Sequence, residues 1–393
     1  MFRYPEFSSW MATVSKHFPG LSKPLTAGLA WWSLGMMLAR SCALSAVAGL
    51  LAPLRGQSFH TVRERLRDRY REASAKAGTH RAELDVTGCW APWWAWVLEG
   101  WSGQQVGIAL DATTLGQRFV ALVISVLYRG CAVPVAWKIL PATEKHPWQP
   151  EWLALWKHFS AVVPPGWTVI VLADRGLYAK WLFQAIQALG WHPLLRINQQ
   201  GTFRPRGWYH GVPLTQRVPT VGRSLASQGT AFHGKEARLE CTLLGRWDAG
   251  HQEAWRVLTD LSPQAAEVCW DGLRAWIEPG FKRLKRGGWP WPYTRMDDPA
   301  RTTAVARDRL GHRVAAVRRR LSRSGLAGRH LADRSRSRSA AEQRLAFGWD
   351  LPPRLELDDR RFARPSNDSR RARRPGTLAN SATEPMLEKN LHF

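Results

Sequence analysis

The sequence has few cysteines, no Cys-x-x-Cys pair and few acidic residues for its length. The five scattered cysteines indicate neither a zinc site nor a disulfide framework, and they fit a reducing cytosol. Only 31 residues are acidic against 56 lysines and arginines, which gives a formal net charge of +25. An excess of positive charge this large is typical of a protein with a polyanionic partner, most often nucleic acid. An acidic membrane surface is the competing interpretation.

Long apolar runs are also scarce, and the one candidate for a membrane span is residues 25–54. Arg40 lies at its centre, where a lone charge costs about 2.5–3.5 kcal/mol or more. No basic segment or small-residue cleavage site precedes the stretch, which argues against a secretory signal. We therefore expect two buried helices of a helical domain and no stable membrane association.

The first 104 residues are predicted to form a helical N-terminal DNA-binding domain. The apolar helices are followed by SFHTVRERLRDRYREASAKAG, a polar and mainly basic helix that Ser58 or Thr61 would cap. A basic, helix-rich segment suits a module that binds DNA ends. A solvated face on a helical bundle explains the same pattern equally well.

The sequence pattern changes at residue 105. From there to residue 299 we expect a domain of mixed strands and helices. Three short apolar runs, VGIALDATTL, RFVALVISVLYRG and CAVPVAWKILP, predict a meander of three strands. A helix, a buried strand, a second helix and another strand follow. This order is that of an α/β ribonuclease-H-like fold. Residues 199–262 interrupt it with a β-rich insertion, in which the turn DAGH predicts a hairpin.

Two aspartates end predicted strands of this domain. Asp111 stands in IALDATTL and Asp174 in TVIVLAD. Polar groups needed for chemistry commonly lie at strand ends, where they emerge from the core into a crevice. Each aspartate alone is also explained as a helix cap, and Asp174 is well placed to cap the helix that follows it.

Glu278 is the single acid of the strongly basic segment RAWIEPGFKRLKRGGW. At helical spacing, residues 274, 278, 281, 282 and 285 lie on or near one face. Glu278 would then face a metal site, while the flanking cations contact the phosphate backbone of DNA; these are Arg274, Lys282, Arg283 and Lys285. A solvated basic helix explains the cations but leaves the acid unexplained.

Together, Asp111, Asp174 and Glu278 are the candidate catalytic residues and metal ligands. Carboxylates a few ångströms apart repel one another unless a cation intervenes. Their hard oxygen atoms suit magnesium or manganese rather than zinc. Two such ions, about 3.5–4 Å apart, support an in-line phosphoryl displacement. We therefore expect two Mg²⁺ (or Mn²⁺) ions as cofactors.

The segment around Glu278 resembles the Tyr–Arg–Glu–Lys motif of bacterial insertion-sequence transposases with a D-D-E catalytic triad. Arg274, Glu278 and Lys285 match the motif in type and spacing. LDATTL and LADRGLY resemble the family's segments around its two catalytic aspartates, at Asp111 and Asp174. The likeness extends from about residue 20 to residue 301.

The resemblance implies a ribonuclease-H-like core with a β-rich insertion and cut-and-paste transposition of a mobile element. A metal-activated water nicks a transposon end, and the freed 3′-hydroxyl then attacks DNA. The implied partners are terminal inverted repeats, target DNA and a second copy of the chain, in the bacterial cytoplasm at the nucleoid. In this family a tryptophan of the insertion can stack on a flipped base; Trp247 and Trp255 both flank the predicted hairpin, and packing explains either of them.

The sequence departs from the family pattern at two positions near Glu278. Asp271 occupies the tyrosine position, where an acid is expected to repel DNA. Pro279 follows Glu278, and proline disfavours helical geometry at the preceding residue. A new helix that begins at Pro279 would place Glu278 at a joint.

The tail, residues 300–393, is a further departure. It is rich in arginine, and segments such as RSRSRSAA and SRRARRPG favour a disordered tail, for which nucleic-acid binding is the functional interpretation. We hypothesise that it is read out of frame, because G/C-rich codons for residues 303–315, shifted by one base, encode an apolar helix. The gene sequence tests this. Two rival functions stay open: an inactive transposase remnant that only binds DNA, and a basic protein anchored in a membrane by residues 25–54.

Overall fold

The computed structural model describes residues 5–71, 76, 84–101, 103–128, 130–142, 147–159, 161–232, 234, 238–279 and 281. Of its two compact units, Met1–Trp349 and Asp350–Phe393, only the first contains described residues. The predictions for Lys282, Arg283, Lys285 and the tail from residue 300 lie outside this part of the chain.

The N-terminal part of the described chain is helical. Its elements are α1 (Pro5–His17), α2 (Lys23–Ala39), α3 (Leu44–Arg55), α4 (Phe59–Arg67), η1 (Asp68–Tyr70), η3 (Thr87–Cys89) and α5 (Trp90–Glu99). The apolar stretch 25–54 forms two helices, as expected, because the chain turns at Arg40, whose φ of 48° ends α2. No single described helix is long and apolar enough to cross a membrane; α2 and α3 together meet that length and composition but are bent by 104°.

The basic helix α4 begins where the sequence predicts. The Ser58 hydroxyl accepts a hydrogen bond from the Thr61 N–H at 3.1 Å, which satisfies one free donor of the first turn. Val62 and Leu66, four residues apart, are the buried side chains of this helix.

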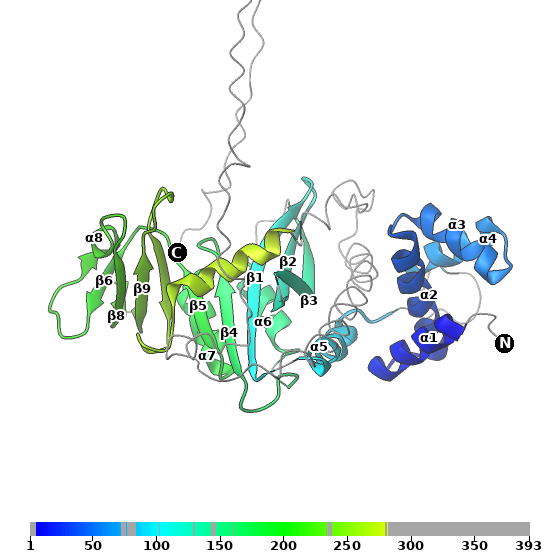
Figure 1. The fold of residues 1–393 in the computed structure, drawn as a ribbon, viewed down its shortest axis with the longest axis horizontal. Coiled ribbons are helices and arrows are strands. Elements are labelled where there is room, and N and C mark those ends of the chain that lie inside the picture. Colours follow the sequence, from blue (N-terminus) through cyan, green and yellow to red (C-terminus); the bar gives the residue numbers. More distant parts are fainter. Residues whose placement is uncertain are drawn as a thin grey trace, which may run out of the picture. The chain divides into compact units, whose positions relative to one another are not determined.

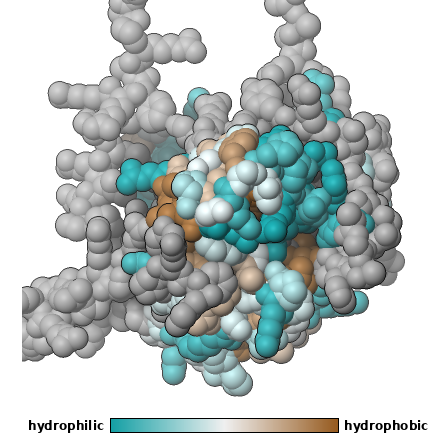
Figure 2. All heavy atoms as spheres, turned by 90° about the vertical axis from the view of Figure 1, so that its right-hand side faces the viewer, coloured by the Kyte–Doolittle hydropathy of each residue, from teal (hydrophilic) through white to brown (hydrophobic). Residues whose placement is uncertain are grey.

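Figure 2 shows one face of the molecule, on which the described residues form both hydrophilic areas and separate hydrophobic patches.

The rest of the described structure is built on a ten-stranded sheet, in the order β3-β2-β1-β4-β5-β10-β9-β8-β6-β7 (Figure 1). The first five strands are β1 (Gln105–Leu115), β2 (Phe119–Tyr128), β3 (Cys131–Pro141), β4 (Thr168–Ala173) and β5 (His192–Arg196). β1, β2 and β3 are an antiparallel meander, as predicted. β4 is parallel to β1, and β5 is parallel to β4.

Helices connect the parallel strands. α6 (Gln149–Trp156) lies between β3 and β4, and α7 (Lys180–Ala188) lies between β4 and β5. Every residue of β4 except the first is buried, which explains why this strand is a continuous apolar run rather than an alternating one. The prediction of a mixed α/β protein is confirmed.

The β-rich insertion continues the same sheet. Its elements are β6 (Thr202–Pro205), β7 (Val212–Pro213), α8 (Leu214–Arg217), β8 (Ser224–Ala231), β9 (Leu239–Arg246) and β10 (Trp255–Thr259). The predicted hairpin is confirmed, because β9 and β10 pair antiparallel around the DAGH turn. β10 also pairs with β5, with Val257 opposite Arg196, so the insertion extends the sheet instead of forming a separate module.

Candidate active site

Asp111 and Asp174 occupy neighbouring positions on adjacent strands. The parallel pairing of β1 with β4 ends at Leu110 and Ala173, and the two aspartates are the next residues of their strands. Strands joined by a ladder lie about 4.7–4.9 Å apart. The sequence predicts that Asp111 ends its strand. In the structure β1 continues beyond Asp111 to Leu115, because these residues pair with β2. The sheet therefore brings these two acids together at the point where β4 ends.

Asp174 does not cap α7. That helix begins at Lys180, and its N-cap residue is Ala179. The Asp174 Oδ1 atom instead accepts a hydrogen bond from the Arg175 N–H at 2.7 Å. Its Oδ2 atom lies 3.5 Å from Nη1 of Arg274, and 38% of the side chain is exposed. The carboxylate is thus open to solvent and is paired with a cation.

The segment that carries Arg274 crosses the sheet as a 3₁₀ helix, η4 (Val268–Trp276), which contacts β10, β9, β4 and β2 (Figure 1). A 3₁₀ helix has three residues per turn, so every third side chain lies on one face. Asp271 and Arg274 follow this spacing toward the sheet. Asp271 Oδ2 lies 3.7 Å from Nη1 of Arg196 in β5, and Arg274 pairs with Asp174 after β4.

Glu278 is exposed in this structure. The α-helical spacing predicted that it would share a face with Arg274. Because η4 is wound with three residues per turn, Ile277 takes that place and is buried. Helical geometry continues through Ile277–Pro279, so the joint in the helix falls before Ile277 rather than at Pro279.

The three predicted ligands do not form one group. Among the residues that the structure describes, no three His, Cys, Asp or Glu side chains are arranged to hold a metal ion. Asp111 and Asp174 supply the oxygen donors that Mg²⁺ or Mn²⁺ prefers, from adjacent strands. The fit to a hard cation therefore rests on this pair, and Glu278 is not placed beside it.

Asp271, which is expected from the sequence to repel DNA, is buried under η4 in this structure. Only 3% of the residue is exposed, and its Oδ1 atom has no hydrogen-bond partner. Burial raises the pKa of Asp271 to about 6; the charges of Arg196 and Arg274 oppose the rise, and that of Asp174 adds to it. The spacing of Asp271 to Arg274 fits an α-helix as well as a 3₁₀ helix, so the sequence alone does not indicate this burial.

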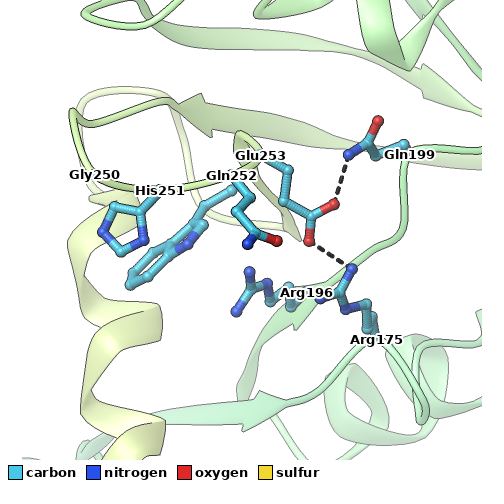
Figure 3. Close-up of a pocket in the computed structure, with 8 residues that line it drawn as sticks. Arg175, Arg196, Gln199, Gly250, His251, Gln252 and Glu253 are labelled. Atoms are coloured by element: carbon cyan, nitrogen blue, oxygen red, sulfur yellow. Dashed lines mark hydrogen bonds and ion pairs between the residues drawn. The ribbon is translucent and has the colours of Figure 1, made fainter. Parts of the chain in front are cut away.

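A pocket of about 600 Å³ lies next to Asp174 and Asp271, because Arg175, which follows Asp174, and Arg196, which pairs with Asp271, both line it. Its lining is Arg175, Arg196, Gln199, Gly250, His251, Gln252, Glu253 and Trp255 (Figure 3). Glu253 is held from two sides, because Gln199 Nε2 donates to it and Arg175 Nη1 lies 2.6 Å from its Oε1. Burial alone would raise the pKa of Glu253, but these partners outweigh burial and lower it. Of these pocket residues, only Trp255 is a candidate on sequence grounds.

The structure separates the two candidate tryptophans. The guanidinium carbon of Arg196 lies 5.0 Å from the centre of the Trp255 ring, and the His251 ring packs edge-on against the same indole at 5.1 Å. Trp255 therefore provides the aromatic surface of the pocket. Trp247 instead donates from Nε1 to the His251 carbonyl oxygen at 2.9 Å, which closes the turn between β9 and β10.

Fold and site together define a mixed α/β protein with two adjacent aspartates beside a basic, aromatic pocket. No protein-family model matches the sequence, and no curated protein matches it. A piggyBac transposase in a synaptic complex with hairpin DNA aligns with 94% of this chain and 89% of its own, at 10% identity and a TM-score of 0.35. Human ENDOV aligns with 59% of this chain and 90% of its own, at 13% identity and a TM-score of 0.26. Because both TM-scores lie below 0.5, neither likeness carries an argument about function.

Proposed function

We propose that the chain is a DNA transposase of the D-D-E type, which nicks the ends of an insertion sequence and transfers the freed 3′-hydroxyl to target DNA. The observation that carries this proposal is the adjacency of Asp111 and Asp174 at the end of β4. The strand order β3-β2-β1-β4-β5, with an antiparallel meander followed by two parallel strands, supports a ribonuclease-H-like core.

Asp111 and Asp174 are the residues that would hold magnesium, whereas Glu278, the third ligand predicted from the sequence, is exposed and is not grouped with them in this structure. When bound, two such ions activate the attacking oxygen and stabilise the leaving one. Arg274 neutralises Asp174 in this structure. A cation held by Asp174 would replace this pairing and would leave the guanidinium free to contact a DNA phosphate, in line with the predicted role of Arg274 in DNA binding.

The pocket would receive a nucleotide next to the cleaved bond. Arg175 and Arg196 supply positive charge for a phosphate, and the Trp255 indole supplies a face on which a flipped base can stack. Gln199 and Gln252 provide amide groups for hydrogen bonds to a base edge. The polar lining and the single indole fit one extrahelical nucleotide better than an apolar ligand.

Trp255→Ala is expected to weaken binding of DNA with one flipped or unpaired terminal base by about 10–100-fold, because stacking contributes about 1–3 kcal/mol per base. Trp181→Ala is the matched control, because this partly buried indole of α7 does not line the pocket. Fluorescence anisotropy with labelled hairpin and blunt-ended DNA measures both variants. Equal losses for the two variants would contradict the assignment of Trp255.

DNA binding as a whole is expected to weaken steeply with salt. Each phosphate neutralised by the basic surface contributes a slope of about −0.9 in a plot of log affinity against log salt concentration. Binding of duplex DNA should show this decline between about 50 and 200 mM salt. A flat response would exclude a phosphate-dominated interface.

The alternative is a remnant that binds transposon ends without cutting them, and the exposure of Glu278 favours it. Inverted repeats in the DNA that flanks the gene give the substrate for the deciding experiment. Purified protein, this end-sequence DNA and Mg²⁺ should yield nicks at the repeat ends, together with a complex of two protein copies on two ends. Binding without nicks would leave the remnant as the function.

A further inference from the structure

The loop 206–211 between β6 and β7 carries two exposed aromatic side chains, Trp208 and Tyr209. We infer that this loop binds unpaired DNA bases by stacking them on Trp208 and Tyr209, with Arg206 and Arg217 holding the adjacent phosphates. This inference does not depend on the metal site. β6 is five strands away from β4 in the sheet, about 24 Å at a strand spacing of about 4.8 Å.

The loop presents its aromatic side chains on a defined turn. The Trp208 N–H donates to the Pro205 carbonyl oxygen at 3.0 Å, and Gly207 has a φ of 83°. A hydrogen bond across four residues, with a positive φ at the third, is the geometry of a type II turn, which favours glycine there. The Arg206 N–H also donates to the Gln228 carbonyl oxygen at 2.9 Å, which ties the turn to β8.

Trp208 and Tyr209 are adjacent and both exposed, by 56% and 94%. A single exposed apolar residue needs no explanation, but two neighbouring large aromatic side chains on a fixed turn are unusual for a surface without a partner. Indole and phenol rings offer flat faces on which any unpaired base can stack. In a duplex the base faces are already stacked, so the pair fits single-stranded DNA better.

The arginines around this aromatic pair are not neutralised by any described acid, although Arg204 Nη2 donates a hydrogen bond to the Thr230 hydroxyl at 3.4 Å. The guanidinium carbon of Arg217 lies 5.8 Å from the centre of the Trp208 ring, and its buried Nε atom has no hydrogen-bond partner. Burial also lowers the pKa of Arg217. Within the described part of the chain, none of the arginines of this region forms an ion pair; they are Arg204, Arg206, Arg217 and Arg223.

The sequence around the loop contains no acid. The segment TFRPRGWYHGVPLTQR, residues 202–217, has three arginines and a histidine but neither Asp nor Glu. A protein partner of this surface would need to be acidic and rich in planar side chains that can stack on Trp208 and Tyr209. Single-stranded DNA has both properties in every nucleotide, because each one carries a phosphate and a base.

The test is fluorescence anisotropy of the full chain with a labelled single-stranded oligonucleotide and, separately, with the matching duplex, both in EDTA. The double variant Trp208→Ala and Tyr209→Ala is expected to weaken single-strand binding by about 10–100-fold and duplex binding by less than about threefold. Trp208→Phe with Tyr209→Phe keeps two aromatic faces and is expected to retain most of the single-strand affinity. Val221→Ala removes an exposed apolar side chain outside the loop 206–211 and is the control for non-specific effects.

The salt dependence of binding separates the contribution of charge from that of stacking. Arg217→Gln is expected to reduce the salt slope of single-strand binding by about one. The aromatic double variant should leave the slope unchanged, because stacking releases no counterions. Wild-type single-strand affinity in that variant would overturn the inference, and so would equal losses on single strand and duplex. A change in oligomeric state without a change in DNA binding would assign the loop to contacts between protein copies instead.

Discussion

Replacing Asp174 with asparagine is expected to abolish Mg²⁺-dependent nicking of transposon-end DNA and to leave DNA binding nearly unchanged. The amide keeps the oxygen that accepts from the Arg175 N–H, so the local backbone is preserved. It removes the negative charge that a divalent cation requires. Metal ions contribute several kcal/mol of transition-state stabilisation, so the nicking rate should fall by about 10³-fold or more.

Asp111→Asn is expected to have the same effect, because its carboxylate occupies the neighbouring position on β1. The measurement is single-turnover nicking of end-sequence DNA followed on a gel, with binding measured separately by gel shift. Asp248→Asn is the matched control, because Asp248 is exposed and pairs with Arg246 in the turn after β9. Wild-type nicking by Asp174→Asn would show that this aspartate is not part of the catalytic site.

The second large effect concerns the buried acid Asp271. Its pKa is raised from 3.8 to about 6 in the folded protein. Because the folded state holds this proton more tightly than the unfolded chain, the stabilising contribution is fully present below pH 3.8. It is lost as the pH rises through about 6. A shift of about 2 units corresponds to a loss of about 3 kcal/mol in the free energy of unfolding.

Asp271→Asn is expected to remove this loss, because an amide stays neutral over the whole range. Urea denaturation of wild type and variant at several pH values between 4 and 7 measures it. The difference between the two proteins should change by about 2–2.5 kcal/mol over this range, in favour of the variant at high pH, and the rest of the effect lies below pH 4. Other carboxylates titrate in both proteins and cancel in the difference. A difference that is independent of pH would show that Asp271 is ionised without cost.

Local sequence patterns predict much of the fold. The apolar runs of β1, β2 and β3 and the DAGH turn of the β9–β10 hairpin are signals within a few residues, and the structure has all of them. The pairing of β10 with β5 could not be predicted in this way. Val257 and Arg196 are far apart in the sequence, and nothing in either strand identifies the other. The insertion was therefore expected as an interruption and is found as a continuation of the sheet.

The candidate site, too, is predicted from the sequence only in part. Asp111 and Asp174 are identifiable because each interrupts an apolar run, and the parallel register then makes them neighbours. The direction of Glu278 depends on how the segment before it is wound. Helices with 3.6 and 3.0 residues per turn share the i, i+3 contacts, so the spacing of Asp271 and Arg274 fits both, and only tertiary packing decides between them.

The central claim, that Asp111 and Asp174 share a divalent cation, is tested most directly by Mn²⁺ binding to the full-length protein. Electron paramagnetic resonance of free Mn²⁺ during a titration gives the number of ions bound and their affinity. We predict that the wild-type protein binds Mn²⁺ and that Asp111→Asn and Asp174→Asn each lose this binding, whereas Asp248→Asn keeps it. Equal Mn²⁺ binding by the wild-type protein and both variants would contradict the claim.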